Sequence, residues 1–315
     1  MIQTDKLTKY YGKKVAVNQV SFQLKKGEIL GFLGPNGAGK STTMKMLTTF
    51  LYPTSGTAIL NGYDICKDPL KVREQIGYLP ENAPLYDEML VKNFLRFAAE
   101  ARRVSQVTQA VERVIEQCFL REVKNQPIFT LSKGYRQRVC FAQAILHNPE
   151  ILILDEPTDG LDPNQKAEVR KMISAMGAGK AILLSTHILE EARATCTRAI
   201  IISEGTIKVD DTPQNLLKLS PQHGVMQLRL MAEIEDEFFL RKTLKELPQI
   251  ESVETKKEEN KCYFVSIRPE KGKEVSGEVL HFLQKKQWKI LSCSISEGRL
   301  EDVFQAVTQS SQEQK

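Results

Sequence analysis

The clearest chemistry in the chain belongs to a glycine-rich loop, Gly34-Pro-Asn-Gly-Ala-Gly-Lys-Ser41, which matches G-x-x-x-x-G-K-[ST] in full. The loop follows an apolar segment typical of a buried strand, residues 29–33, and precedes a helix-like segment, residues 42–50. Glycines let backbone N–H groups close around phosphate oxygens, and the start of a helix adds partial positive charge. We therefore expect Lys40 to reach the β- and γ-phosphates and Ser41 to bind Mg²⁺. The predicted phosphate-binding residues are Gly34, Pro35, Asn36, Gly37, Ala38, Gly39, Lys40, Ser41 and Thr42.

Two carboxylates follow a second apolar segment, residues 151–154. Ligands of open α/β sheets bind beyond the carboxyl ends of the strands, where Asp155 and Glu156 are expected to lie. Asp155 suits the coordination shell of Mg²⁺, and Glu156 suits the general base that polarises an attacking water. Taken alone, such a pair could equally cap a helix, but beside a phosphate-binding loop it predicts the hydrolytic half of one site.

The elements that position these residues alternate along residues 1–210 between short β-branched segments and segments of helical period. This pattern predicts an α/β domain with a largely parallel sheet. Strands are expected at 29–33, 76–79, 151–154, 181–185 and 199–202. Residues 7–24 predict antiparallel strands with a turn near Gly12. Residues 91–120 hold two helical segments and little strand, which indicates a helical insertion over about 82–145.

The pattern changes after residue 212. A Pro/Gly-marked stretch, 213–224, predicts a linker. The pattern of residues 225–310 predicts a small α+β module with elements in the order β-α-β-β-α-β, a ferredoxin-like fold. Residues 311–315 are expected to form a polar tail. Leu291, Cys293 and Ile295 alternate with serines, as expected for a half-buried strand, and a last helix carries an apolar stripe formed by Leu300, Val303, Phe304 and Val307.

Composition narrows the class of protein. Hydrophobic residues make up 41% and charged residues 26%, close to the average of soluble globular proteins. No apolar run is long enough to span a membrane, and the first residues lack the apolar core of a signal peptide, so we expect a cytoplasmic protein. Residues 1–210 carry a net charge of +6, which suits a nucleotide but also a nucleic acid.

The six cysteines are scattered, without C-x-x-C spacing. Their spacing excludes a zinc site of the usual kind and predicts reduced, mostly buried thiols.

Between the loop and the carboxylates lies Leu131-Ser-Lys-Gly-Tyr-Arg-Gln-Arg-Val139, where Ser132 could simply cap a helix. The segment also resembles the signature sequence of ABC transporters. With the order of the other motifs, this makes residues 1–210 similar to the ATP-binding subunits of that family. The resemblance implies a P-loop NTPase core of the ABC type, with ATP and Mg²⁺ as cofactors.

The resemblance also implies roles for individual side chains. Tyr11 is placed like the aromatic residue that stacks on adenine. Ser132 and Gly134 correspond to residues that contact the γ-phosphate from the opposite subunit. Asp162 matches the loop that crosses between two sites, and His187 matches the switch histidine that contacts the γ-phosphate.

Some residues depart from the usual family pattern. Lys133 and Tyr135 replace a glycine and the glutamine of L-S-G-G-Q. Glu81 stands where the family usually has a glutamine, and the carboxylate of Glu81 could still bind Mg²⁺ or its waters. These variants, with Leu300-Glu-Asp-Val-Phe304, resemble the bacterial exporter branch associated with gliding motility, sodium or drug extrusion, and lipid or polysaccharide export.

The resemblance implies an ATPase that powers export through a separate membrane permease and is peripheral on the inner face of the cell membrane. One loop and one signature in the chain imply a head-to-tail homodimer that closes around ATP. The permease contact is expected at the insertion, residues 91–120.

Two alternatives remain at this point. One is a soluble ABC ATPase that acts on the ribosome or on nucleic acid. Ribosomal relatives, however, usually carry two ATPase cores in one chain, and DNA-repair relatives carry long heptad arms, which this sequence lacks. The sequence also lacks a strongly basic tail, so no nucleic acid is expected as a partner. The other concerns residues 211–315, which could sense substrate, stabilise the dimer through the last helix, or only cap the first domain.

Overall fold

The computed structural model describes residues 1–82, 84–232, 237–259 and 261–309. They divide into two compact units, Met1–Pro213 and Gln214–Lys315, and each unit encloses a hydrophobic cluster of its own. The predicted tail, 311–315, lies outside the described residues.

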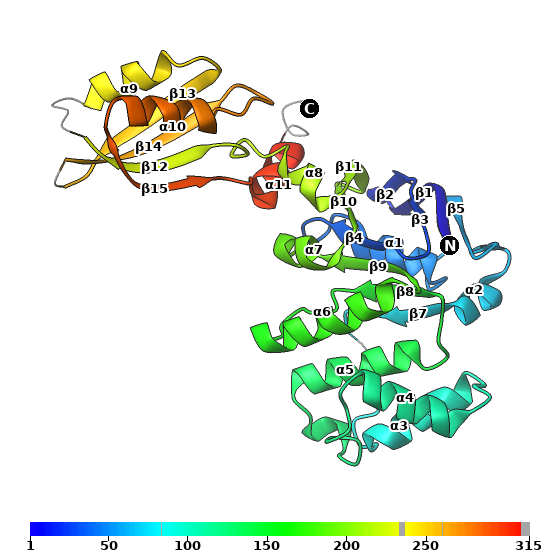
Figure 1. The fold of residues 1–315 in the computed structure, drawn as a ribbon. Helices are drawn as coiled ribbons and strands as arrows, with labels where there is room; N and C mark the ends of the chain where they lie inside the picture. Colours follow the sequence, from blue (N-terminus) through cyan, green and yellow to red (C-terminus); the bar gives the residue numbers. More distant parts are fainter. Residues whose placement is uncertain (83, 233–236, 260, 310–315) are drawn as a thin grey trace. The chain divides into compact units, whose positions relative to one another are not determined.

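The first unit is built on a six-stranded sheet with most of its strands parallel (Figure 1). Its strands are β4 (Ile29–Leu33), β7 (Ile76–Leu79), β8 (Ile151–Asp155), β9 (Ala181–Thr186), β10 (Arg198–Ser203) and β11 (Thr206–Asp211), in the order β11-β10-β4-β9-β8-β7. The strands from β10 to β7 are parallel, and β11 is antiparallel to β10. Every residue of β4, β8 and β9 is buried, as parallel strands are when both faces of the sheet are covered.

A second, antiparallel sheet lies in the same unit. It holds β1 (Ile2–Tyr11), β2 (Lys14–Val20), β3 (Gln23–Leu24), β5 (Ser55–Leu60) and β6 (Tyr63–Asp64). The turn between β1 and β2 contains Gly12 at φ 58°, as the sequence predicts. Helix α1 (Lys40–Leu47) contacts β2 and β8, so it lies between the two sheets and buries Met44, Met46 and Leu47 there. It begins two residues before the predicted helix.

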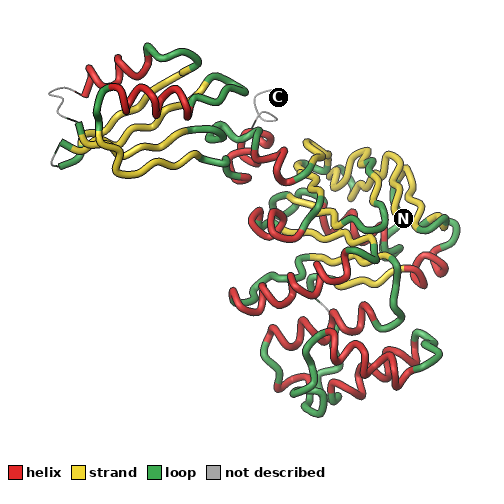
Figure 2. Tube along the Cα trace, viewed as in Figure 1, coloured by secondary structure: helices red, strands yellow, loops and turns green. Residues whose placement is uncertain are grey.

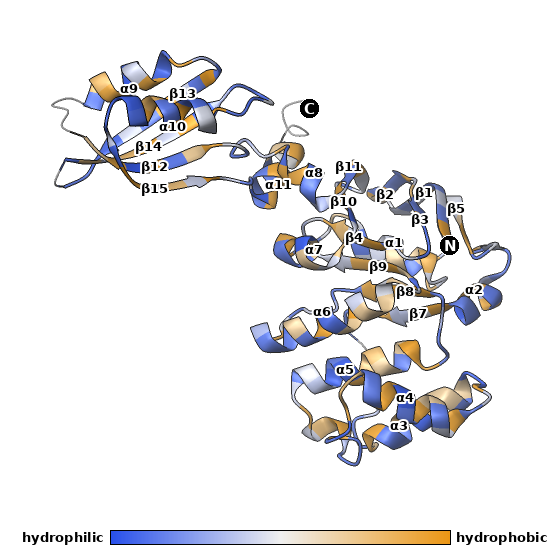
Figure 3. Ribbon diagram, viewed as in Figure 1, coloured by the Kyte–Doolittle hydropathy of each residue, from blue (hydrophilic) through white to orange (hydrophobic). Residues whose placement is uncertain are grey.

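Helices follow β7 within the predicted insertion. They are α3 (Val91–Ala101), α4 (Val107–Gln117), a 3-10 turn η1 (Ile128–Thr130) and α5 (Lys133–Ile145). Helix α2 (Pro69–Gln75) lies before β7 in the sequence. Figure 1 shows α3, α4 and α5 grouped together, and Figure 3 shows hydrophobic and hydrophilic residues on both α3 and α4. Helix α5 packs closely on β7, because a Cβ at Gly77 would lie 2.3 Å from the carbonyl oxygen of Ala144. Only glycine allows this approach.

Two more helices complete the first unit, α6 (Pro163–Gly177) and α7 (Leu189–Thr195). Asp162 begins α6, since its Oδ1 accepts a hydrogen bond of 2.9 Å from Gln165 N, and Pro163 follows at the first helical position.

The second unit contains a four-stranded antiparallel sheet with helices (Figure 2). Its elements are α8 (Pro213–Leu217), β12 (Met226–Met231), α9 (Glu237–Lys245), β13 (Ile250–Lys257), β14 (Cys262–Pro269), α10 (Ser276–Lys285), β15 (Lys289–Ile295) and α11 (Leu300–Gln309). The sheet order is β13-β14-β12-β15. Burial alternates along β12 and β14, and the buried face packs against α9 and α10 through Leu240, Leu244, Val279 and Leu283.

Strand β15 differs from the prediction. All seven of its residues are exposed, including Leu291, Cys293 and Ile295, although their alternation with serines predicted a buried face. In the described structure β15 is an edge strand that pairs only with β12, and none of its residues belongs to the hydrophobic cluster that α9 and α10 form with β12, β13 and β14. In α11, by contrast, Leu300 and Val303 of the predicted stripe are buried.

No helix of the described residues is long and apolar enough to cross a membrane. Of the six free cysteines, Cys118, Cys140 and Cys196 are buried, and burial raises the pKa of each thiol to about 12. Cys66 and Cys293 are exposed, so the prediction of mostly buried thiols holds for only half of them.

Candidate active site

The glycine-rich loop leaves the carboxyl end of β4 and borders a cavity of about 390 Å³. Gly37 and Gly39 have φ of 83° and 107°, in the left-handed region that favours glycine, and a Cβ at Gly34 would lie 2.4 Å from Ile202 O. The cavity is lined by Tyr11, Lys14, Ala16, Pro35, Asn36, Gly37, Gly39, Lys40, Ser41, Thr42, Glu81, Glu156, Asp159 and His187.

Lys40 is buried under the loop. Its Nζ donates hydrogen bonds to Gly34 O at 2.7 Å and to Pro35 O at 3.3 Å, and it lies 3.3 Å from Glu156 Oε1. The ammonium group is therefore held at the floor of the cavity by two carbonyl dipoles and one carboxylate. A phosphate entering the loop would compete with Glu156 for this charge.

Glu156 is strained and firmly placed. It has φ of 49°, a left-handed conformation that costs a non-glycine residue about 1–3 kcal/mol. Its backbone N donates to Ser185 Oγ at 2.9 Å, and its Oε2 lies 3.0 Å from Nδ1 of His187. The ends of β8 and β9 thus bring together the two side chains that the sequence predicted as catalytic.

Asp155 lies deeper, at 1% exposure. Its Oδ1 accepts hydrogen bonds from Ser41 Oγ at 3.1 Å and from Ser185 Oγ at 2.6 Å. The hydroxyl of Ser41 and the carboxylate of Asp155 are hard oxygen donors side by side, which is the chemistry that Mg²⁺ prefers. The residues present therefore fit this ion.

Sequence reasoning missed several residues of the site. Lys14, Ala16 and Asp159 line the cavity, and Ser185 joins Asp155 to the backbone of Glu156. Ser185 is the first polar residue of an otherwise apolar stretch in β9, and that position was the available signal. The hydroxyl of Tyr78 is buried without a hydrogen-bond partner among the described residues.

Six predicted residues do not line the cavity, and three of these belong to the signature segment or the start of α6. Ser132 caps α5, where its Oγ accepts from Tyr135 N at 3.4 Å, and Asp162 caps α6. Gly134 packs against Gln165, because a Cβ there would lie 2.4 Å from its side chain. The signature segment and the start of α6 are therefore neighbours outside the cavity. Gly34, Ala38 and Asp155 lie just behind the lining.

A buried carboxylate connects the loops around the site. Glu191, on α7, accepts hydrogen bonds from the hydroxyls of Thr158 and Thr186, and its Oε1 lies 3.2 Å from Lys166 Nζ. These partners come from the segment after β8, the end of β9 and helix α6. Glu191 thus fixes the segments that carry His187 and Asp162.

A parallel sheet with a phosphate-binding loop after one strand and an acidic pair after another defines the class of P-loop NTPases. Comparison with known proteins identifies the family. A family model described as "ABC transporter" matches residues 17–159. The linearmycin resistance ATP-binding protein LnrL of Bacillus subtilis is 30% identical over 311 residues, which cover 98% of both chains. The chain belongs to the family of ABC transporter ATP-binding proteins.

Other relatives match about two thirds of the chain. The probable multidrug ABC transporter ATP-binding protein YbhF of Escherichia coli is 36% identical over 219 residues, 69% of this chain but 38% of YbhF. A solved ATP-binding subunit of an ABC transporter is 32% identical, with a TM-score of 0.63 over 69% of this chain and 91% of that one. A dimeric ATP-binding cassette solved with ADP and phosphate has the same TM-score at 22% identity and shows the fold alone.

Proposed function

We propose that this chain binds ATP with Mg²⁺, hydrolyses it, and thereby powers export through a separate membrane permease. The observation that carries the proposal is the cluster of Lys40, Glu156 and His187 in one cavity beside the glycine-rich loop. Ser41 lines the same cavity, and Asp155 is hydrogen-bonded to Ser41 from behind the lining. Export agrees with the multidrug and linearmycin-resistance names of two relatives.

ATP would lie along the cavity from Tyr11 to Lys40. Tyr11 is 48% exposed at the end of β1 and lines the cavity, with Lys9 Nζ 5.7 Å from its ring centroid, so its ring is available to stack on adenine. The loop residues from Gly34 to Thr42 would hold the phosphates through backbone N–H groups. Lys40 would exchange its contact with Glu156 for the β- and γ-phosphates.

Mg²⁺ would be held by Ser41 and Asp155, and Glu81 on the cavity wall would contact the ion or its waters. Bound there, the ion would neutralise charge on the phosphates. It would also screen the negative charge of Glu81 from the γ-phosphate.

Glu156 would act as the general base for the attacking water. When a phosphate draws Lys40 away, one carboxylate oxygen of Glu156 is freed, while its backbone stays fixed by Ser185. His187, 41% exposed and beside Glu156, would contact the γ-phosphate. The same side chains that pair with each other before binding would then face the nucleotide.

A second copy of the chain would complete the site. Ser132, Gly134 and Asp162 lie outside the cavity of their own chain, so a head-to-tail homodimer would let Ser132 and Gly134 approach the γ-phosphate of the partner. The helical insertion, residues 91–120, would contact the permease, placing the protein at the inner face of the cell membrane.

We further propose the following domain organisation: residues 1–212 as the ABC ATPase domain, 213–224 as a linker, and 225–310 as a ferredoxin-like module. The antiparallel order β13-β14-β12-β15 and the β-α-β-β-α-β sequence of elements support this description of the module.

The decisive test is ATP turnover by Lys40→Ala with and without Mg²⁺. Loss of the ammonium group should abolish nucleotide binding or hydrolysis. Lys71→Ala is the matched control, because Lys71 is an exposed lysine on α2 that pairs with Asp68. Near-normal turnover by Lys40→Ala would refute the site. Copurification of the unmutated chain with a membrane permease tests the transport part, and copurification with ribosomes instead would contradict it.

A further inference from the structure

A second cavity, of about 540 Å³, opens between the end of α3, the start of α4 and the loop after α5. That loop, Leu146–Asn148, precedes the first residue of β8, whereas Asp155 ends the same strand. The cavity therefore lies at the opposite end of β8 from the nucleotide cavity, and we call it the arginine cleft.

The lining of the arginine cleft is rich in hydrogen-bond donors. Three guanidinium groups contribute to it, from Arg102, Arg103 and Arg113, and no Asp or Glu does. No carboxylate oxygen of the described residues lies within 4.0 Å of these three groups. In the same helical region, Arg96 and Arg121 both pair with glutamates.

Burial, together with the arginines of the cleft, lowers the pKa values of neighbouring side chains. Arg102 Nη1 lies 3.1 Å from His147 Nε2, and Arg113 Nη2 donates to Leu146 O at 2.7 Å. Burial lowers the pKa of His147 to about 4, with contributions from the charges of Arg102, Lys180 and Arg113. Burial and the charge of Arg113 also lower the pKa of Lys180, although Glu150 acts in the opposite direction.

Helix α4 adds to this field. It is 11 residues long, has no side-chain cap at its start and no acidic residue in its first turn. Gln106, its N-cap, and Gln109 both line the cleft. Unpaired N–H groups at such a helix start attract anions.

We propose that the arginine cleft binds a phosphorylated small molecule, a function separate from the proposed ATPase site. The uncompensated guanidiniums provide the attraction, and arginine matches phosphate oxygens in bidentate geometry. The volume lies in the range of small-molecule sites, roughly 300–1,000 Å³, and accommodates a ligand larger than a single phosphate. The phosphate belongs either to a free metabolite or to the headgroup of a lipid.

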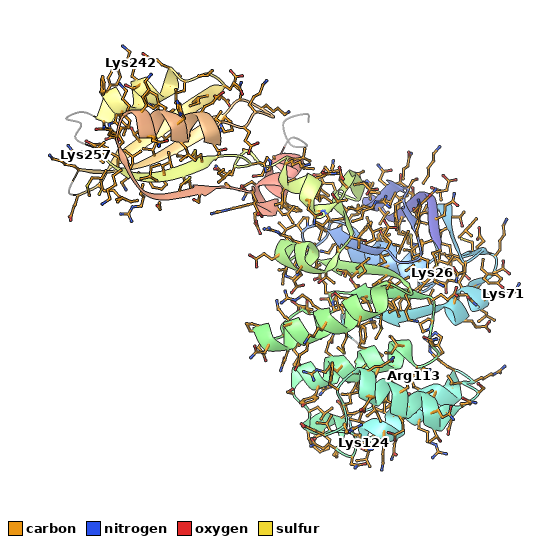
Figure 4. All side chains as sticks on the ribbon, viewed as in Figure 1. Lys26, Lys71, Arg113, Lys124, Lys242 and Lys257 are labelled. Atoms are coloured by element: carbon orange, nitrogen blue, oxygen red, sulfur yellow. The ribbon has the colours of Figure 1, made fainter. Side chains whose placement is uncertain are left out.

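Pyrophosphate is the probe for the free form, titrated by calorimetry into the full chain carrying Lys40→Ala, which removes the lysine of the first site. We expect saturable binding at one site per chain. Adding Arg102→Gln and Arg113→Gln should weaken it about tenfold or more, because charge-assisted hydrogen bonds are lost. The control, Arg96→Gln with Arg121→Gln, removes equal charge from the same region (Arg113 is labelled in Figure 4).

The lipid form is tested by sedimentation with phosphatidylcholine vesicles, with and without phosphatidic acid. Cosedimentation that requires phosphatidic acid and Arg102 with Arg113 identifies a headgroup, whereas pyrophosphate binding without cosedimentation identifies a free metabolite. Absence of both, or an equal loss in the control variant, overturns the proposal.

His147 provides a readout that needs no variant. A bound anion would neutralise Arg102 and Arg113, so the pKa of His147 should rise from about 4. Histidine ring signals followed by NMR across pH, with and without pyrophosphate, measure this shift. An unchanged His147 titration at saturating pyrophosphate places the ligand elsewhere and rejects the cleft.

Discussion

Glu156 shares its carboxylate between Lys40 and His187, so one substitution tests its role against that of its partners. Glu156→Gln keeps the shape of the side chain and leaves Ser41 and Asp155 to hold the metal. Hydrolysis should fall about 10²–10⁴-fold, the usual effect of losing a general base, while ATP binding persists. Turnover and nucleotide affinity measure the two effects separately.

If ATP binding without hydrolysis is enough to close two chains around the nucleotide, the Glu156→Gln variant should accumulate as an ATP-bound dimer in size-exclusion chromatography. Glu190→Gln, an exposed residue in the first turn of α7, is the control. Normal hydrolysis by Glu156→Gln would remove the base from the mechanism, and a persistent monomer would remove the dimer.

Tyr78 offers a prediction about stability. Burial raises the pKa of its hydroxyl above the usual range, as do the charges of Asp155 and Glu81, so the group stays protonated and can donate. The donor has no partner in the described structure. Because an unsatisfied buried donor destabilises, Tyr78→Phe should leave the free energy of unfolding unchanged or raise it by up to ~1 kcal/mol. Urea denaturation measures it, and a clear loss of stability would reveal a partner.

Among the helices and strands, Glu191 holds the loops around the site in place, because its carboxylate joins α7 to α6, to the end of β9 and to the segment after β8. Glu191→Ala should lower the free energy of unfolding by about 1–3 kcal/mol, because the buried hydroxyls of Thr158 and Thr186 lose their acceptor. It should also lower kcat more than it raises KM, because His187 loses its support while the phosphate-binding loop does not. Glu190→Ala, its exposed neighbour, should do neither.

Elements with a strong local pattern could be predicted from the sequence. The apolar strands β4, β8 and β9 were found within two residues of their bounds, because burial on both faces leaves no polar interruption. The sequence reading missed β5, β6 and β11, whose mixed burial gives no clear period. The exposure of β15 depends on its place at the sheet edge, which no local pattern contains.

The site was predictable for a related reason. Phosphate binding uses consecutive backbone groups, so the loop from Gly34 to Thr42 appears as one motif. Ser185 and Lys14 reach the site only because β9 lies beside β8 and because β2 approaches the loop. Such contacts between distant segments require the fold itself.

At the scale of the whole molecule, all residues of the proposed ATPase site belong to Met1–Pro213, which has its own hydrophobic core. A protein that ends at Pro213 should therefore bind ATP with an affinity within about threefold of the full chain, a difference under 1 kcal/mol. Fluorescence titration with a labelled nucleotide measures this. An insoluble product would show instead that the second unit covers surface that the first cannot expose.

Helix α5 approaches β7 closely at Gly77, where the missing side chain makes room for the carbonyl oxygen of Ala144. The helix is 13 residues long, about 20 Å, and Ser132 lies at the opposite end from Ala144, where Gly134 packs against Gln165. A tilt of ~10° about this point of close approach would move Ser132 by about 3 Å, the length of one hydrogen bond. A small tilt of α5 is therefore enough for Ser132 to form or lose a contact with the other chain of the proposed dimer. Gly77, about which the helix would tilt, belongs to β7, the strand that leads to Glu81.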